Sequence, residues 1–166
     1  MKLAKKICLI GRFGVGKTSL VKQYIDKQFS EKYKTTVGVS ISTKSLLLDD
    51  IELSLVIWDI AGFEHDGHYN HYLRGVHGLI WVIDGTEPES FSILDTMTHS
   101  LPQLKQIPSI CFINKHDLIS DWIIGNNEID ILTKNHHLVL NSSAKTGKNV
   151  ELGFQTLAKL LLNQHD

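Results

Sequence analysis

The sequence has few of the residues that mark specialised classes of protein. Its 166 residues include two cysteines, three prolines and two arginines, and the formal net charge is −1. Cys8 and Cys111 each lie inside an apolar segment, which predicts buried thiols in a reducing compartment rather than a disulfide framework. A charge this close to neutral gives no indication of a broad nucleic-acid-binding or membrane-binding surface, and we expect no nucleic-acid partner.

Long hydrophobic segments are also missing. No apolar stretch approaches the ~18 residues that a transmembrane helix needs. Residues 1–6 lead directly into a strand and lack the pattern of a signal peptide, and residues 161–166 hold no cysteine for prenylation. We therefore expect a cytoplasmic protein, with peripheral membrane association only if a lipidated tail follows these residues.

The composition is that of an ordinary globular chain, with 42% hydrophobic and 21% charged residues, and predicts one domain over residues 1–166. Apolar segments alternate with amphipathic ones, which predicts an open, mostly parallel α/β sheet of six strands with helices on both faces. Residues 40–48 and 51–58 form a hairpin, so one edge strand is antiparallel. Strands are expected at 7–10, 40–48, 51–58, 78–84, 108–113 and 137–140, and helices at 19–25, 88–104, 126–135 and 147–162.

The segment from Gly11 to Thr18 carries the first chemical motif. It reads G-x-x-x-x-G-K-T and lies between a predicted strand and a predicted helix, where a phosphate-binding loop belongs and a plain glycine-rich turn is the weaker alternative. Its backbone N–H groups and the following helix N-terminus would face a phosphate. Lys17 is expected to reach the β- and γ-phosphates, and Thr18 to bind Mg²⁺. The predicted phosphate-site residues are Gly11, Phe13, Gly14, Val15, Gly16, Lys17, Thr18 and Ser19.

A second motif, Asp59-Ile60-Ala61-Gly62, follows the strand that ends near Trp58. The carboxylate can hold Mg²⁺ through water, and the Gly62 N–H can bond a γ-phosphate oxygen that exists only in the triphosphate. Thr36, in the polar loop from Phe29 to Gly38, is the natural second hydroxyl ligand. The expected metal ligands are therefore Thr18, Thr36 and Asp59, and the expected catalytic groups are Lys17, Thr36 and Gly62.

Two further motifs predict the base. Asn114-Lys115-His116-Asp117 follows the strand 108–113, and Ser143-Ala144-Lys145 follows the strand 137–140. A carboxylate at Asp117 accepts hydrogen bonds from N1–H and N2–H₂ of guanine, and adenine has no such donor pair, so an unpaired buried carboxylate would reject adenine. The expected supporting contacts are Lys115 over the base plane, Ala144 N–H to O6, Ser143 to Asp117, and Phe29 stacked on the base.

The motifs occur in the order and nearly at the spacing of the Ras superfamily, and the chain resembles a small GTPase (a P-loop GTPase, or G domain) throughout its length. It is most similar to the Rab branch in residues 36–39, 57–59 and 72–78. The resemblance implies a monomeric GTP/GDP switch that uses Mg²⁺. It also implies that residues 32–38 and 62–74 respond to the γ-phosphate and contact protein effectors, an exchange factor and an activating protein.

Departures from that pattern affect hydrolysis. Family members usually carry Gln directly after Asp-x-x-Gly to orient the attacking water, and here Phe63 cannot make those hydrogen bonds. Phe13 stands where Ras proteins keep Gly, and the second switch is one residue shorter than in Rab proteins. We expect slow hydrolysis of GTP to GDP and phosphate. The alternative is a hydrolysis-deficient, permanently GTP-bound binding module. A P-loop kinase is disfavoured because Asp117 has no role in phosphorylating a substrate.

Three features have two interpretations each. His65, His68 and His71 recur at helical spacing and form either a metal site or a solvated face. Arg12 is either an arginine finger in the same chain or a solvent-facing residue. Trp58 belongs either to a partner-binding patch or to the core.

Overall fold

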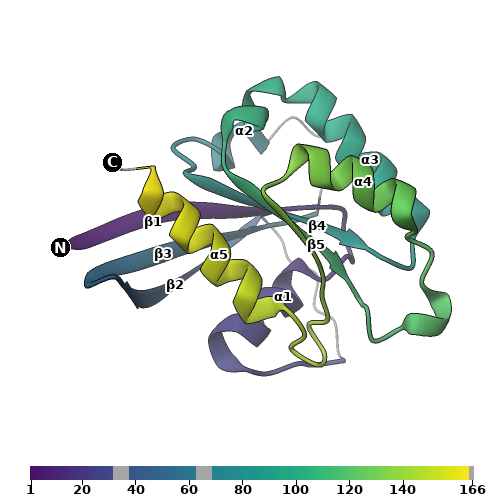
Figure 1. Ribbon diagram of the computed structural model, residues 1–166, viewed down its shortest axis with the longest axis horizontal. Helices are drawn as coiled ribbons and strands as arrows, with labels where there is room; N and C mark the ends of the chain where they lie inside the picture. The colour runs from purple at the N-terminus through teal and green to yellow at the C-terminus, as the bar shows by residue number, and fades with distance from the viewer. Residues whose placement is uncertain (32–37, 63–68, 165–166) are drawn as a thin grey trace.

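One six-stranded sheet runs through the molecule (Figure 1). The computed structural model describes residues 1–31, 38–62 and 69–164. The strands are β1 (Lys2–Ile10), β2 (Val39–Leu48), β3 (Ile51–Ile60), β4 (Gly78–Asp84), β5 (Ser109–Asn114) and β6 (Leu138–Asn141). Their order is β2-β3-β1-β4-β5-β6, in which β2 is antiparallel to β3 and the other neighbours are parallel. The predicted sheet with one antiparallel edge strand is confirmed.

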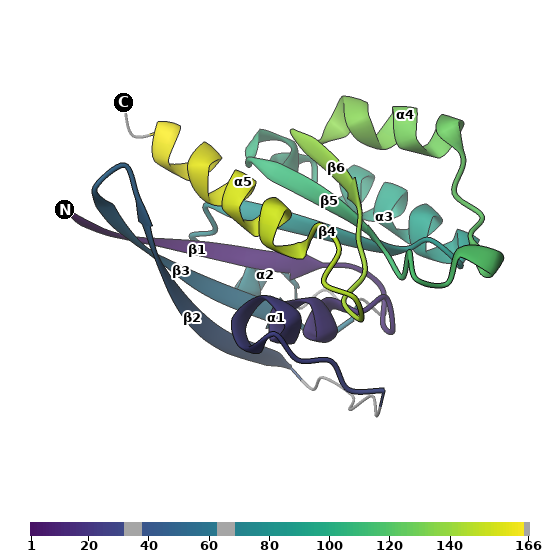
Figure 2. The ribbon, with the colours of Figure 1, turned by 60° about the horizontal axis from the view of Figure 1, so that its bottom comes forward.

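Helices cover both faces of this sheet, as Figures 1 and 2 show from two directions. One face carries α1 (Lys17–Asp26) and α5 (Val150–Asn163), and the other carries α2 (Tyr69–Tyr72), α3 (Pro88–Ser100) and α4 (Asn126–Asn135). Two 3₁₀ helices, η1 (Pro102–Gln106) and η2 (Ile119–Asp121), lie in the connections. Among the described residues, no helix has the length and apolar composition to cross a membrane.

Each face of the sheet packs its own hydrophobic core. Beneath α1 and α5, the ring of Tyr24 stacks on Phe154 with 3.9 Å between centroids. Beneath α3 and α4, Trp81 and Met97 are almost completely buried. Every residue of β4 and β5 is buried, as expected for parallel strands covered on both faces. The core therefore fixes the central strands, whose carboxyl ends carry the motifs.

The two cysteines belong to these central strands. Cys8 and Cys111 are free and buried, which confirms the prediction of core thiols. Burial raises the pKa of Cys8 to about 12, while the charge of Lys6 opposes that shift. Burial also raises the pKa of Cys111, so both thiols stay protonated.

The structure corrects several helix boundaries. The predicted helix 88–104 is two elements, because α3 ends at Ser100 and η1 begins at Pro102. Proline lacks an N–H and disfavours helical geometry at the residue before it, here Leu101 with φ −127°. The last helix begins at Val150 rather than at residue 147, because Asn149 has a left-handed backbone with φ 60°. The short elements α2 and η2 were not predicted, since four and three residues carry no helical periodicity.

A buried imidazole makes the fold sensitive to acid. His136 follows α4, and its Nδ1 lies 2.9 Å from the hydroxyl of Ser109. Burial, with a smaller effect of neighbouring His137, lowers the pKa of His136 to about 4. An unfolded chain with a histidine pKa near ~6.5 takes up this proton first, so stability falls as pH decreases from ~6.5 to ~4.

We predict that His136→Gln removes this pH-dependent component, about 2 kcal/mol of unfolding free energy between neutral pH and pH ~4.5. Urea unfolding at both pH values measures it, with the exposed residue His99 changed to Gln as a control. An unaltered acid slope in the His136 variant would contradict the assignment.

Candidate functional site

The loop from Gly11 to Thr18 curls around the amino group of Lys17. The Lys17 Nζ donates to the carbonyl oxygens of Gly11 at 2.8 Å and Arg12 at 3.1 Å. Among the described residues this leaves one of its three donors for a ligand. Gly14 and Gly16 have φ 82° and 104°, a backbone conformation that favours glycine. The first turn of α1 has no intrahelical acceptor for its N–H groups, so the loop and helix together suit an anion.

A carboxylate and a hydroxyl meet beside this loop. The Thr18 hydroxyl donates to Asp59 Oδ2 at 2.6 Å. The other oxygen, Asp59 Oδ1, is buried and has no hydrogen-bond partner among the described residues. An unpartnered buried carboxylate oxygen next to a hydroxyl fits a hard divalent cation that prefers oxygen ligands, as Mg²⁺ does.

The charges at the site are held away from water. Burial lowers the pKa of Lys17 to about 8, while the Asp59 carboxylate raises it. Burial likewise raises the pKa of Asp59, against the opposing effects of the Thr18 hydrogen bond and the Lys17 charge. A partner of opposite sign, an anion for Lys17 and a cation for Asp59, would move each pKa back towards its ordinary value.

The side-chain amide of Asn114 connects this loop to the base motifs; we call its contacts the Asn114 junction. Asn114 is buried, and its Nδ2 donates to the Val15 carbonyl at 3.0 Å. Its Oδ1 accepts from the Ser142 hydroxyl and from Ala144 N–H, each at 3.2 Å. A Cβ on Gly16 would collide with the same amide. One side chain therefore sets the spacing between the phosphate loop and residues 142–144.

Asp117 is positioned by the second base motif. The Ser143 hydroxyl donates to Asp117 Oδ1 at 2.7 Å and accepts from Thr146 N–H at 3.1 Å, so the predicted Ser143–Asp117 contact is present. Lys115 has a left-handed backbone, φ 70°, and its ammonium lies 2.7 Å from the buried carboxylate of Asp84. That ion pair ties the Lys115 side chain to Asp84, the last residue of β4.

The other residues predicted to contact the base are Ala144, Lys145 and Phe29. The Ala144 N–H, expected to serve guanine O6, donates to Asn114 Oδ1 in the structure. The Lys145 ammonium lies 3.3 Å from Glu31 in the segment that follows α1. Phe29, from that segment, exposes 39% of its surface, so its ring is open to a stacking partner.

Phe13 and Gly62 pack against each other. A Cβ on Gly62 would collide with the backbone of Phe13, while the Phe13 side chain is 43% exposed. The second motif is held further by Tyr69, whose hydroxyl donates to the Ala61 carbonyl at 2.9 Å. The phosphate loop thus contacts the glycine that is expected to sense the γ-phosphate.

Arg12 has partners at the start of α3. Its Nη1 lies 2.9 Å from Glu89 and 3.4 Å from Glu87. Both interpretations drawn from the sequence are therefore incomplete, because the guanidinium is neither a free finger nor simply solvated.

Part of the site predicted from the sequence lies outside the described residues. Thr36, Phe63, His65 and His68 lie outside the described residues, as do most of 32–38 and much of 62–74. His71 is exposed, and the described part of the chain has no group of three or more His, Cys, Asp or Glu residues that could hold a metal ion.

Trp58 is partly buried and lies between other side chains. Its ring is tilted against Tyr72, with 6.5 Å between centroids, and the Lys6 ammonium lies 3.6 Å from its ring centroid. Trp58 therefore packs against one core and stays partly accessible. The core interpretation and the partner-binding interpretation each apply to it in part.

Sequence reasoning missed four residues that shape the site. Asp84 pairs with Lys115, and Glu87 and Glu89 pair with Arg12. Trp122 packs so closely over Gly85 that a Cβ there would collide with its ring. Only Asp84 carried a usable signal, since an acidic residue at the carboxyl end of a fully buried strand requires a partner.

Comparison with known proteins fits this geometry. The family model described as "Ras family" matches residues 6–163. The chain belongs to the Ras family. It is 36% identical to the Ras-related protein Rab-7b of Mus musculus, over 97% of this chain and 84% of that protein. It is 35% identical to the Ras-related protein Rab-1 of Theileria annulata, over 94% and 73%. The protein is thus a Rab-like small GTPase, a switch of a family that binds GTP or GDP with Mg²⁺ and acts through regulators and effectors.

The Asn114 junction generates a prediction about stability. Asn114→Ala leaves the Val15 carbonyl, the Ser142 hydroxyl and the Ala144 N–H without their partner, so we expect a loss of about 3 kcal/mol. Urea unfolding of nucleotide-free protein measures it, and the exposed residue Asn127 changed to Ala is the control. Equal stability of the two variants would show that the junction contributes nothing to the fold.

Proposed function

We propose that this Ras-family protein forms one G domain over residues 1–166 and hydrolyses bound GTP slowly to GDP and phosphate. The Asn114 junction is the observation that supports this best, because it ties the phosphate loop to the loop that holds Asp117. A guanine nucleotide would bridge the same two loops. Residues 32–38 and 62–74 would then report the nucleotide state to partners in trafficking or signalling.

Phosphate binding is assigned to the loop from Gly11 to Ser19. The free donor of Lys17 and the backbone N–H groups would hold the β- and γ-phosphates, and the Gly62 N–H would bond the γ-phosphate. Thr18, Thr36 and Asp59 would hold Mg²⁺, which supplies positive charge against the phosphate oxygens. The Oδ1 of Asp59, which has no hydrogen-bond partner in the described part of the chain, supports this set.

Base selection is assigned to Asp117. With Oδ1 engaged by Ser143, the carboxylate keeps acceptor capacity for the N1–H and N2–H₂ groups of guanine. Lys115, held by Asp84, would lie over the base plane, Phe29 would stack on the base, and Lys145 would lie beside it. Ala144 N–H would be shared between Asn114 Oδ1 and guanine O6.

Asp117→Asn tests the base assignment. The amide donates where the O2 of xanthine accepts, so preference should move from guanosine to xanthosine nucleotides by at least about tenfold. Competition against a fluorescent GDP analogue measures the change, with the exposed Asp95 changed to Asn as a control. ATP displacing the analogue from the unmodified protein as well as GTP does would refute guanine selectivity.

Slow hydrolysis follows from groups that the site lacks. Phe63 cannot position water, and the chain contains two arginines, Arg12 and Arg74. Arg12 would have to leave Glu87 and Glu89 to stabilise charge on the γ-phosphate. Fast turnover would thus need a partner that supplies a water-orienting side chain, an arginine or both.

We predict intrinsic turnover at or below about 10⁻⁴ s⁻¹, the scale of an unassisted Ras-type enzyme. Phe63→Gln alone should help little while Phe13 remains beside Gly62, and Phe13→Gly combined with it should gain more than the sum of the single changes. Single-turnover phosphate release with excess Mg²⁺ measures these rates. Cleavage within seconds by the unmodified protein would contradict the proposal.

The aromatic residues Phe13 and Phe63 also favour a second candidate, a hydrolysis-deficient module that stays bound to GTP. The same assay separates the two functions. GDP that accumulates over hours supports slow turnover, whereas GTP that remains intact supports the module.

A further inference from the structure

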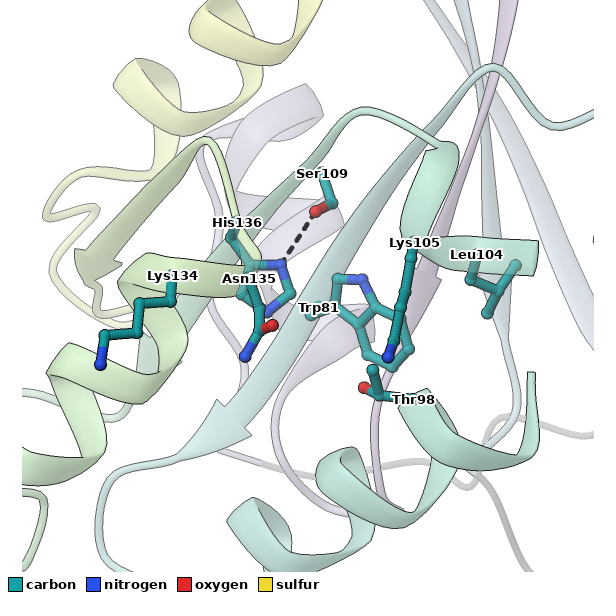
Figure 3. A pocket seen from close by; sticks show the side chains of 8 residues that line it. All are labelled: Trp81, Thr98, Leu104, Lys105, Ser109, Lys134, Asn135 and His136. Carbon is teal, nitrogen blue, oxygen red and sulfur yellow. Dashed lines mark hydrogen bonds between the residues drawn. The ribbon is translucent and has the colours of Figure 1, made fainter. Parts of the chain in front are cut away.

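A buried carboxylate lies at the carboxyl end of β4, beside the strand that carries the Asn114 junction. Asp84 is the last residue of β4 and is 1% exposed. It lies in register with Asn114 of β5, the residue before Lys115. The strand is fixed further back by Trp81, which is 3% exposed and whose ring centroid lies 6.0 Å from that of His136 in the cavity wall of Figure 3. Asp84 therefore has a fixed position in the sheet.

Both oxygens of this carboxylate accept hydrogen bonds. Oδ1 accepts from the N–H of Thr86 at 2.8 Å and from its hydroxyl at 2.6 Å. Oδ2 lies 2.7 Å from the ammonium of Lys115. A buried charge needs such partners, and here they fix the orientation of the carboxylate as well as its position. Asp84 therefore presents one oxygen to its own loop and the other to Lys115.

Lys115 is held at both ends of its side chain. Its backbone is left-handed, with φ 70°, and its ammonium is paired with Asp84. The methylene groups between these two ends consequently follow a fixed path, and 34% of the side chain remains exposed. A lysine stem can cover an apolar surface while its charge lies elsewhere. The site therefore offers a ligand the stem of a lysine whose charge is already offset by Asp84.

We propose that Asp84 is a positioning residue for nucleotide binding and acts through Lys115. The inference rests on the proposed function, in which Lys115 lies over the base plane. Ordering a long side chain during binding costs free energy, and Asp84 orders this one before the nucleotide arrives. Asp84 therefore prolongs the residence of the nucleotide, whereas Asp117 selects the base. Since the ammonium faces a carboxylate, the effect does not depend on the number of phosphates.

Asp84→Asn tests this role, because an amide has one acceptor oxygen and cannot serve both Thr86 and Lys115. We expect a fluorescent GDP analogue to be released into excess GDP and Mg²⁺ about tenfold faster than from the unmodified protein. A non-hydrolysable GTP analogue should show the same change, and the preference for guanosine over xanthosine nucleotides should stay. Glu52→Gln is the control, since it removes an exposed ion pair with Lys2 at the amino end of β3.

A double-mutant cycle separates positioning from a general structural effect. Lys115→Met keeps a long apolar side chain but loses its contact with Asp84, so release should again be about tenfold faster. Adding Asp84→Asn to Lys115→Met should cause no further change, because Asp84 acts through the ammonium. The double variant leaves neither member of the ion pair unpaired, so it carries the test if Asp84→Asn does not fold.

Unchanged release from Asp84→Asn, or from the double variant if the single variant does not fold, would overturn the inference. Effects that multiply to about 100-fold in the double variant would also overturn it, as would a changed base preference in Asp84→Asn. In each of these cases the unmodified protein still binds the GDP analogue, and the proposed function stands. An unmodified protein that does not bind the analogue would overturn the proposed function and this inference with it.

Discussion

The amide of Asn114 is the contact on which the candidate site depends. It lies at the carboxyl end of a fully buried strand and joins Val15 on one side to Ser142 and Ala144 on the other. Gly16 has no room for a side chain because its backbone faces this amide. The phosphate loop and the base loop come from distant parts of the sequence, and a single buried side chain holds them in register. Since buried polar groups need all of their partners, this connection is both specific and vulnerable.

The same burial that creates the site also leaves it with uncompensated charge. Lys17 has a lowered pKa and Asp59 a raised one, because the effect of burial on each charge is larger than the opposing effect of its neighbours. In the proposed function a triphosphate with Mg²⁺ would supply the missing partners, so that nucleotide binding would stabilise the folded state. Arg12, by contrast, forms ion pairs with Glu87 and Glu89 at the surface. Ion pairs there contribute little to stability, so Arg12 can exchange them for other partners.

Much of this arrangement can be predicted from the sequence, because periodicity and motif position carry it. The strand before Gly11, the helix after Thr18, the hairpin at residues 40–58 and the Ser143–Asp117 contact follow from local patterns combined with the rule that motifs gather at strand ends. Contacts set by tertiary packing could not be found that way. Arg12 with Glu89, or Trp122 over Gly85, depends on where α3 and η2 fall in space. The break before Pro102 was visible in the sequence, yet the apolar pattern across it favoured one long helix.

The proposed role of the Asn114 junction is to assemble phosphate and guanine recognition into a single site. The most direct measurement is to denature the purified protein and identify the released nucleotide by chromatography against standards. We expect the released nucleotide to be GDP or GTP, close to one per chain, and we expect Mg²⁺ to be released by the same treatment. Release of an adenine nucleotide, or of no nucleotide from protein purified in Mg²⁺, would contradict it.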